Sequence, residues 1–283
     1  MRKMLRNVRE AIDDSLINRL PPGVWQRVRR MDEGQSEYGF DPFGFDPEFL
    51  KYIGPPAHWI FKKYFRTEVF GIENVPDTGP VMLIANHSGQ VAIDGMIIGS
   101  ACIFEKEPAR MIRSMVEYWV PTLPFVSWIL ARGGQVTGTR ENARILLGRN
   151  GCLLIFPEGV RGISKTYDRA YQLEDFGLGF MRLALETKVP IVPVGVVGGE
   201  EQIPSVYNFE SLAKMFGAPA FPIAPTGPLP LPVKYRLYFG EPMLFEGKPD
   251  DEDRVIRAKV SQVKAQIETL VQRGLDERQG YFF

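Results

Sequence analysis

Apolar residues recur along the chain in short runs, and longer segments between those runs carry apolar residues at helical spacing. The runs of strand length lie at residues 68–72, 80–85, 152–156, 190–197 and 233–239. The helical segments between them lie at about 91–104, 140–149 and 178–188. Strands that alternate with helix-length segments are typical of a mostly parallel sheet covered on both faces. The pattern therefore predicts an α/β fold with a sheet of about seven strands and flanking helices.

The two ends of the chain have helical patterns of their own. The apolar stripe of the first twenty residues consists of Met1, Met4, Leu5, Val8, Ile12 and Leu16. The stripe near the other end consists of Ile256, Val260, Val263, Ile267 and Leu270, and it predicts a docking helix at 250–275. Pro55 and Pro56 predict that no continuous helix runs through 48–66. We expect an N-terminal helical extension at 1–66, followed by one domain at 67–283.

Composition excludes several classes of protein. The chain is 45% hydrophobic and 24% charged, which excludes wholesale disorder, and its formal net charge of zero gives no support for a nucleic-acid partner. Cys102 and Cys152 lie in apolar surroundings and fit buried thiols in a reducing compartment better than a disulfide or a metal site. The sequence shows no signal peptide and no uninterrupted apolar stretch long enough to span a membrane.

Two clusters of basic residues suggest contact with a membrane surface. Residues 1–30 hold eight basic side chains against three acidic ones. The second cluster, at 51–66, consists of Lys51, Lys62, Lys63 and Arg66 with Tyr52, Trp59, Phe61, Tyr64 and Phe65. Aromatic rings lie at headgroup depth, and each basic residue near an anionic surface contributes about 1 kcal/mol. We expect a peripheral or monotopic protein at the cytoplasmic face of a membrane. Solvated helices that pack on their own core are the alternative.

A histidine and an aspartate follow the predicted strand at 81–85. Asn86-His87 falls where that strand ends, which is where ligands gather in open α/β sheets. Asp94 follows near the start of a helical segment. It could accept a hydrogen bond from one ring nitrogen of His87 while the other nitrogen takes a proton from a hydroxyl group. Taken alone, the pair fits a helix-capping Asp and a structural His at least as well.

A second polar constellation follows the strand at 152–156. In Phe156-Pro157-Glu158-Gly159-Val160-Arg161-Gly162, proline ends the strand and the glycines permit tight turns. Arg161 can bind a phosphate through two hydrogen bonds, and Glu158 can accept from a hydroxyl or orient an arginine. Residues 133–142 add another glycine-flanked arginine, Arg140. Each arginine alone fits a surface turn, whereas the two together indicate an anion site.

In this order and spacing, the segments resemble the glycerolipid acyltransferases of the lysophosphatidic-acid acyltransferase superfamily. The four sequence blocks of that family resemble Asn86-His87 with Asp94, Gly134 through Arg140, Phe156 through Arg161, and the proline-containing strand at 189–194. The resemblance covers about residues 66–245, and the third block is specific.

The resemblance implies an O-acyltransferase domain at 67–283 with defined roles for its residues. It implies His87 as the catalytic base, Asp94 as its partner, and Arg140, Glu158, Gly159 and Arg161 as ligands of the acceptor's glycerol-phosphate end. A fatty acyl group would move from a thioester donor, acyl-CoA or acyl carrier protein, to a glycerolipid hydroxyl, without a metal, a cofactor or a covalent acyl-enzyme. The acceptor implied is a lysophospholipid such as 1-acylglycerol-3-phosphate.

Two positions depart from the family pattern. Six residues separate His87 from Asp94 where four are usual, with Ala92 at the usual Asp position, and Gly162 replaces the usual Ser after Arg161. Branches that act on mono- or diacylglycerol are similarly loose, so a neutral acylglycerol or another lipid alcohol stays open as the acceptor. A lipid-binding pseudoenzyme is a further alternative. A water-using esterase is disfavoured because the chain lacks a Gly-x-Ser-x-Gly elbow.

The apolar residues of 118–130 and the Pro-rich interval at 219–232 are candidates for an acyl-chain groove. Ordinary core or a packed loop is the alternative for both segments.

Overall fold

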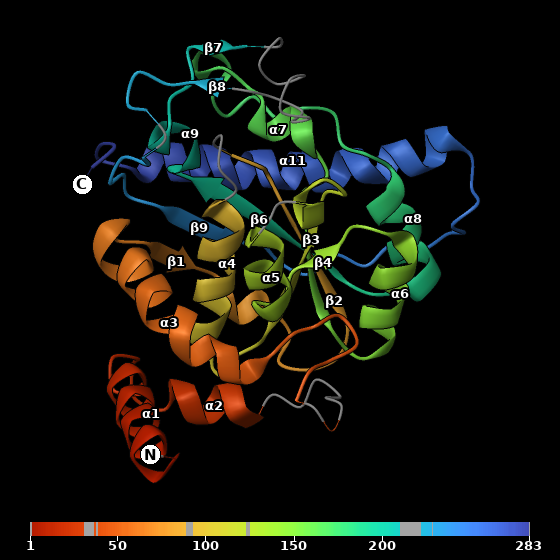
Figure 1. The fold of residues 1–283 in the computed structure, drawn as a ribbon. Coiled ribbons are helices and arrows are strands. Elements are labelled where there is room, and N and C mark those ends of the chain that lie inside the picture. Colours follow the sequence, from red (N-terminus) through yellow and green to blue (C-terminus); the bar gives the residue numbers. More distant parts are fainter. Residues whose placement is uncertain are drawn as a thin grey trace.

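A seven-stranded sheet forms the centre of the computed structural model, which describes residues 2–30, 37, 39–88, 93–122, 125–209, 222–227 and 229–282. Its strands are β1 (Glu68–Phe70), β2 (Val81–Ala85), β3 (Ile112–Val116), β4 (Val136–Thr137), β5 (Cys152–Ile155), β6 (Ile191–Val197) and β9 (Arg236–Phe239). They lie in the order β1-β9-β6-β2-β5-β3-β4 (Figure 1), and every pair is parallel except β6 with β9. The predicted α/β fold with a mostly parallel, covered sheet is confirmed.

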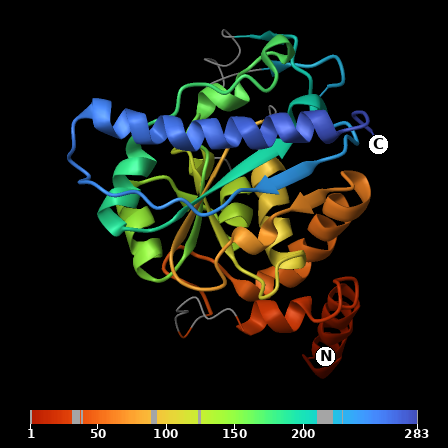
Figure 2. The same cartoon turned by 180° about the vertical axis from the view of Figure 1, so that it is seen from behind.

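Helices cover both faces of the sheet (Figures 1 and 2). One face carries α3 (Leu50–Trp59), α4 (Ile93–Phe104) and α5 (Val126–Arg132), and the other carries α6 (Arg140–Gly148), α8 (Gly179–Thr187) and α11 (Asp253–Glu277). The side chains of strand β2 point alternately to the two covered faces of the sheet. Val81, Leu83 and Ala85 pack in the core on the α4 side, whereas Met82 and Ile84 pack on the α11 side. Burial on both faces explains why the strands read as continuous apolar runs.

The shorter elements lie around this framework. They are α1 (Arg2–Ile17), α2 (Val24–Arg30), α7 (Val160–Ile163), α9 (Gly199–Gln202) and the antiparallel pair β7 (Tyr207–Asn208) and β8 (Pro222–Ile223). The docking helix predicted at 250–275 is α11, which buries Ile256, Val263 and Ile267. It packs directly on β6, because a Cβ atom at Gly195 would lie only 2.7 Å from the Cβ of Leu270.

The prediction that Pro55 and Pro56 interrupt the helix was wrong. Both lie inside α3, which continues as a π-helical turn over Ile60–Tyr64, where the Phe65 amide donates to the Ile60 carbonyl at 2.9 Å. The two prolines remove two helical hydrogen bonds. Apolar side chains on both sides of them hold the backbone, since Leu50 and Phe61 are buried in the core.

The structure places much of the second basic-aromatic cluster inside the fold. Lys51 pairs with Asp13 and Glu48, Lys62 pairs with Glu105, and Phe61 and Phe65 are core residues. Trp59 and Lys63 are exposed. Within the described part of the chain, no helix is both long and apolar enough to cross a membrane. The association of residues 1–66 with a membrane remains a prediction.

Chain connections bring three turns to one edge of the sheet. Helix α4 carries the chain from β2 to β3 on one face, and α8 carries it from β5 to β6 on the other. Since β5, β2 and β6 are parallel neighbours, the turns that follow them lie side by side. Such an edge, where crossovers leave in opposite directions, is the usual place of a ligand crevice.

Candidate active site

The side chain of Asn86 fixes the first of these turns. Its amide nitrogen donates to the Val196 carbonyl at 3.0 Å, and its oxygen accepts from the Val196 amide at 2.7 Å. Asn86 is fully buried, so both bonds are made away from water. The residue therefore continues the pairing of β2 with β6 past the end of the strand and sets the direction in which His87 leaves the sheet.

His87 lies against Asp94, as the sequence predicted that it could. The His87 Nδ1 and Asp94 Oδ2 atoms are 2.7 Å apart. The same carboxylate accepts the Ser88 amide at 2.9 Å and the Gly95 amide at 2.8 Å. Asp94 stands in the first turn of α4, where helix amides favour negative charge. A carboxylate can only accept, so Nδ1 carries the proton and Nε2 is left to act as a base.

The imidazole ring is also held by packing. It stacks on Phe156 with ring centroids 4.1 Å apart and an interplanar angle of 18°. On another side, a Cβ atom at Gly162 would lie 2.8 Å from the His87 Cβ and 3.1 Å from its carbonyl oxygen. The glycine that departs from the family pattern is thus the residue that this close approach requires. Ala92 lies outside the described residues.

Glu158 holds the main chain of the same histidine. Its Oε1 accepts the His87 amide and its Oε2 accepts the Glu174 amide, each at 2.8 Å. The Glu158 side chain is fully buried. The contacts to main-chain amides take the place of the predicted contact with an arginine, and a role for Glu158 in binding substrate stays a prediction.

A buried lysine and a second glutamate continue this network. The Lys165 Nζ lies 3.6 Å from Glu158 Oε2 and 2.8 Å from Glu200 Oε1. Burial raises the pKa of Glu200, and the Lys165 ammonium opposes that rise. The sequence alone predicted no role for Lys165 or Glu200. The position of Glu200 just after the carboxyl end of β6 could have marked it as a site residue, because ligands gather at such strand ends. The described residues contain no cluster of three or more His, Cys, Asp or Glu side chains arranged to hold a metal ion.

The structure does not bring both predicted arginines to the histidine. Arg161 lies on α7 next to the Gly162–His87 contact, and its guanidinium donates to the Asp175 carbonyl at 2.7 Å. Arg140 starts α6 and pairs with Glu186 at 2.9 Å. It follows β4, three strand positions from β2, a lateral separation of about 14 Å at ordinary strand spacing. Their role in binding the acceptor stays a prediction.

Gly159 has a conformational reason to be glycine. Its φ of +58° is in the left-handed region, and a Cβ atom there would lie 3.3 Å from Glu117 Oε1. It allows the chain to turn sharply between Glu158 and α7. A role for Gly159 in binding the acceptor stays a prediction.

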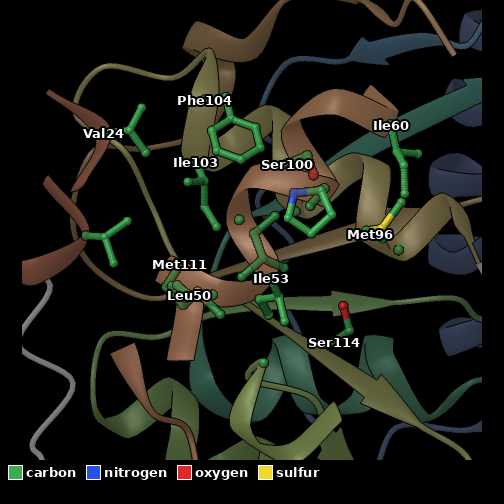
Figure 3. A pocket seen from close by; sticks show the side chains of 18 of the residues that line it. Val24, Leu50, Ile53, Ile60, Met96, Ser100, Ile103, Phe104, Met111 and Ser114 are labelled. Carbon is green, nitrogen blue, oxygen red and sulfur yellow. The ribbon is translucent and has the colours of Figure 1, made fainter. Parts of the chain in front are cut away.

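An apolar cavity of about 320 Å³ lies beside this site. Its walls come from α2, α3, α4, α5 and β3, and Figure 3 shows Leu50, Ile53, Ile103, Phe104 and Met111 among the side chains that line it. Gly95 and Gly99 of α4 form part of the wall. A Cβ atom at Gly95 would lie 3.7 Å from the Phe156 ring, the ring on which His87 stacks. The cavity therefore ends close to the imidazole.

The two segments expected to form a groove contribute little to this cavity. Among the described residues of 118–130, only Ile129 and Leu130 line it, whereas Tyr118, Phe125 and Trp128 are exposed. Leu123 lies outside the described residues. No described residue of the Pro-rich interval lines it.

Comparisons with known proteins agree with the geometry. The acyltransferase family model matches residues 66–197. An uncharacterized protein of Mycobacterium leprae is 37% identical over 260 residues, which cover 88% of this chain and 71% of that protein. A Bos taurus protein described as a DGAT1/2-independent enzyme synthesizing storage lipids is 28% identical over 197 residues, covering 68% of this chain and 56% of that protein.

A solved structure shares the fold. The crystal structure of the 1-acyl-sn-glycerophosphate acyltransferase PlsC from Thermotoga maritima aligns with a TM-score of 0.54 and 20% sequence identity. The alignment covers 99% of this chain and 100% of that chain.

The Gly162→Ser variant tests whether close packing fixes the histidine. Because its new Cβ would lie 2.8 Å from that of His87, we expect a loss of about 1–3 kcal/mol in the free energy of unfolding, measured by urea denaturation. Gly177→Ser is the matched control in the same connection between β5 and α8, since its Cβ would have only an ordinary contact at 3.7 Å. Equal stability of the two variants would contradict the packing argument.

Proposed function

The chain belongs to the glycerolipid acyltransferase superfamily and is an O-acyltransferase, and we propose that it transfers a fatty acyl group from a thioester donor to a hydroxyl group of a lysophospholipid such as 1-acylglycerol-3-phosphate. The observation that carries this proposal is the 2.7 Å contact of His87 Nδ1 with the Asp94 carboxylate, beside an apolar cavity. A base next to an apolar chamber suits a reaction between a fatty acyl thioester and an alcohol.

The chemistry proposed for His87 is general base catalysis. As the acceptor oxygen attacks the thioester carbonyl carbon, its proton passes to Nε2, and Asp94 stabilises the imidazolium through Nδ1. The tetrahedral intermediate then collapses, the carbon–sulfur bond breaks, and the imidazolium returns its proton to the departing thiolate. The products are the ester and the free thiol, with no acyl group on the enzyme and no metal or cofactor in any step.

The acyl chain of the donor is proposed to occupy the cavity. Each buried methylene group contributes about 0.8 kcal/mol, so an apolar chamber beside the base would hold a fatty chain with its carbonyl carbon near Nε2. The thiol carrier, coenzyme A or acyl carrier protein, would remain outside this chamber.

The position of Arg161 supports an acceptor that bears a phosphate group, but its contacts also favour a second class of acceptor. It is exposed on α7, adjoining the glycine that contacts His87. However, its guanidinium already donates to the Asp175 carbonyl, and Arg140 is paired with Glu186. Because both arginines are engaged, transfer to a neutral acceptor, a mono- or diacylglycerol or another lipid alcohol, is the second candidate. The bovine relative is described as an enzyme synthesizing storage lipids, which agrees with this alternative.

We further propose that the protein works as a peripheral or monotopic protein at the cytoplasmic face of a membrane. Val8 and Ile12 of α1 are each about half exposed, at 51% and 52%, and Trp59 of α3 is 57% exposed. Helices α1 and α3 are joined by the Lys51–Asp13 ion pair. Their exposed apolar side chains would enter the interface, and the excess of basic residues at 1–30 would meet anionic headgroups.

Substitution of the base tests the proposed reaction. His87→Ala should lower kcat by about 10²–10⁴-fold without unfolding the chain. The assay offers labelled acyl-CoA or labelled acyl-acyl carrier protein as the donor, and a lysophospholipid, a monoacylglycerol or a diacylglycerol as the acceptor. His58→Gln is the matched control, because His58 is the only other histidine and lies on α3. Full activity of the alanine variant would refute the role of His87. Donor and acceptor binding without turnover under every pairing would identify a pseudoenzyme.

The Gly99→Leu variant tests where the acyl chain lies. A Cβ atom at Gly99 would meet no other atom within 4 Å, so leucine should project into the cavity without straining the helix. We expect kcat/KM to fall for long-chain donors and to change little for short-chain donors. The control is Gly148→Leu, which adds the same side chain at an equally open position that does not line the cavity. A uniform loss for all chain lengths would argue against the assignment.

Vesicle sedimentation tests the membrane proposal on the full chain. Val8→Ser combined with Ile12→Ser and Trp59→Ser should lower binding to anionic vesicles, because it removes the apolar side chains expected to enter the interface. Leu244→Ser is the control, since Leu244 is 73% exposed and lies outside these helices. Unchanged binding of the triple variant would exclude this surface as the anchor.

A further inference from the structure

Lys165 is buried next to the carboxylate that holds His87. Its side chain is 1% exposed, and that of Glu158 is fully buried. Besides its contacts with Glu158 and Glu200, the Lys165 ammonium donates to the Gln172 carbonyl at 3.2 Å. These acceptors lie around a cation that is almost completely removed from bulk water.

The charge of Glu158 needs this cation. A carboxylate removed from water is costly unless charge or hydrogen bonds compensate it. Two main-chain amides compensate Glu158 in part. The remaining charge faces Lys165 at 3.6 Å, beyond hydrogen-bond distance but well within the range of a strong Coulomb interaction in a buried site.

The ion pair of Lys165 with Glu158 is linked to His87 through the Glu158 side chain. Glu158 Oε1 receives the His87 amide, and Oε2 faces Lys165. Without the ammonium, the Glu158 and Glu200 carboxylates would face each other unscreened, and like charges at this depth repel. Relief of that repulsion by movement of Glu158 would release the His87 amide.

We propose that Lys165 is a positioning residue for acyl transfer: its buried ammonium keeps Glu158 in place between two main-chain amides and thereby fixes where His87 stands. This inference rests on the proposed function for its kinetic consequence, but its structural consequence does not. Lys165 touches neither reacting atom; it acts through Glu158.

The kinetic test compares two buried lysines. Lys165→Met should lower kcat by roughly tenfold to a hundredfold, the effect of a small misplacement of a catalytic group, and leave KM for the donor little changed. Lys106→Met is the matched control. Lys106 is buried to a similar extent, at 2% side-chain exposure, and pairs with Asp77, outside the His87 network. It should lose thermal stability and keep its kcat.

A second variant tests the repulsion between the two buried carboxylates. Lys165→Met combined with Glu200→Gln keeps the net charge of the buried triad, because one cation and one carboxylate are removed together. Because the repulsion between Glu158 and Glu200 is then gone, this double variant should regain part of the stability and part of the kcat that Lys165→Met loses. A double variant that regains stability while its kcat stays as low as that of Lys165→Met would overturn the proposal.

Histidine-labelled NMR gives a readout that needs no activity. The chain has only two histidines, so the imidazole spectrum holds one signal from His87 and one from His58 as an internal reference. Both Lys165 variants should shift the His87 signal and leave that of His58 unchanged, whereas Lys106→Met should shift neither. An unmoved His87 signal overturns the positioning role. A moved signal without acyl transfer to any acceptor would instead place the failure in the proposed function.

Discussion

The buried carboxylate of Asp94 joins helix α4 to the turn that carries His87, and the geometry of the site depends on that junction. It accepts hydrogen bonds from the His87 ring nitrogen and from the main-chain amides of Ser88 and Gly95. Three donors converge on one side chain at a helix N-terminus, where negative charge is favoured. The longer His–Asp spacing of this chain is therefore compatible with the pairing, because the helix start determines where the carboxylate lies.

Two buried hydroxyl groups near Asp94 lack hydrogen-bond partners in the described part of the chain. The Ser88 and Tyr235 hydroxyls are buried, and neither has a hydrogen-bond partner among the described residues. Each such group costs about 1–3 kcal/mol. Burial raises the pKa of the Tyr235 hydroxyl, and the nearby Asp94 charge adds to that rise. The packed strands and α11 offset this cost.

Periodicity and short motifs predicted those parts of the molecule whose structure depends on residues close together in the sequence. The runs at 80–85 and 152–156, the helix at 250–275 and the proximity of His87 to Asp94 all depend on neighbours in sequence. The Lys165–Glu200 pair and the cavity do not, since residues far apart in the chain form them. Pro55 and Pro56 misled the prediction because tertiary packing of Leu50 and Phe61 outweighs local helix breaking.

Helix α4 carries Asp94 at its start and Gly95 and Gly99 along the cavity wall. One helix thus belongs to both the apolar chamber and the junction that orients His87. Thermodynamic linkage makes any coupling of this kind reciprocal. If a bound chain steadies α4 and so orders the imidazole, then an ordered imidazole must in return tighten the binding of the chain by the same factor. Occupancy of the chamber and order of the imidazole would therefore rise and fall together.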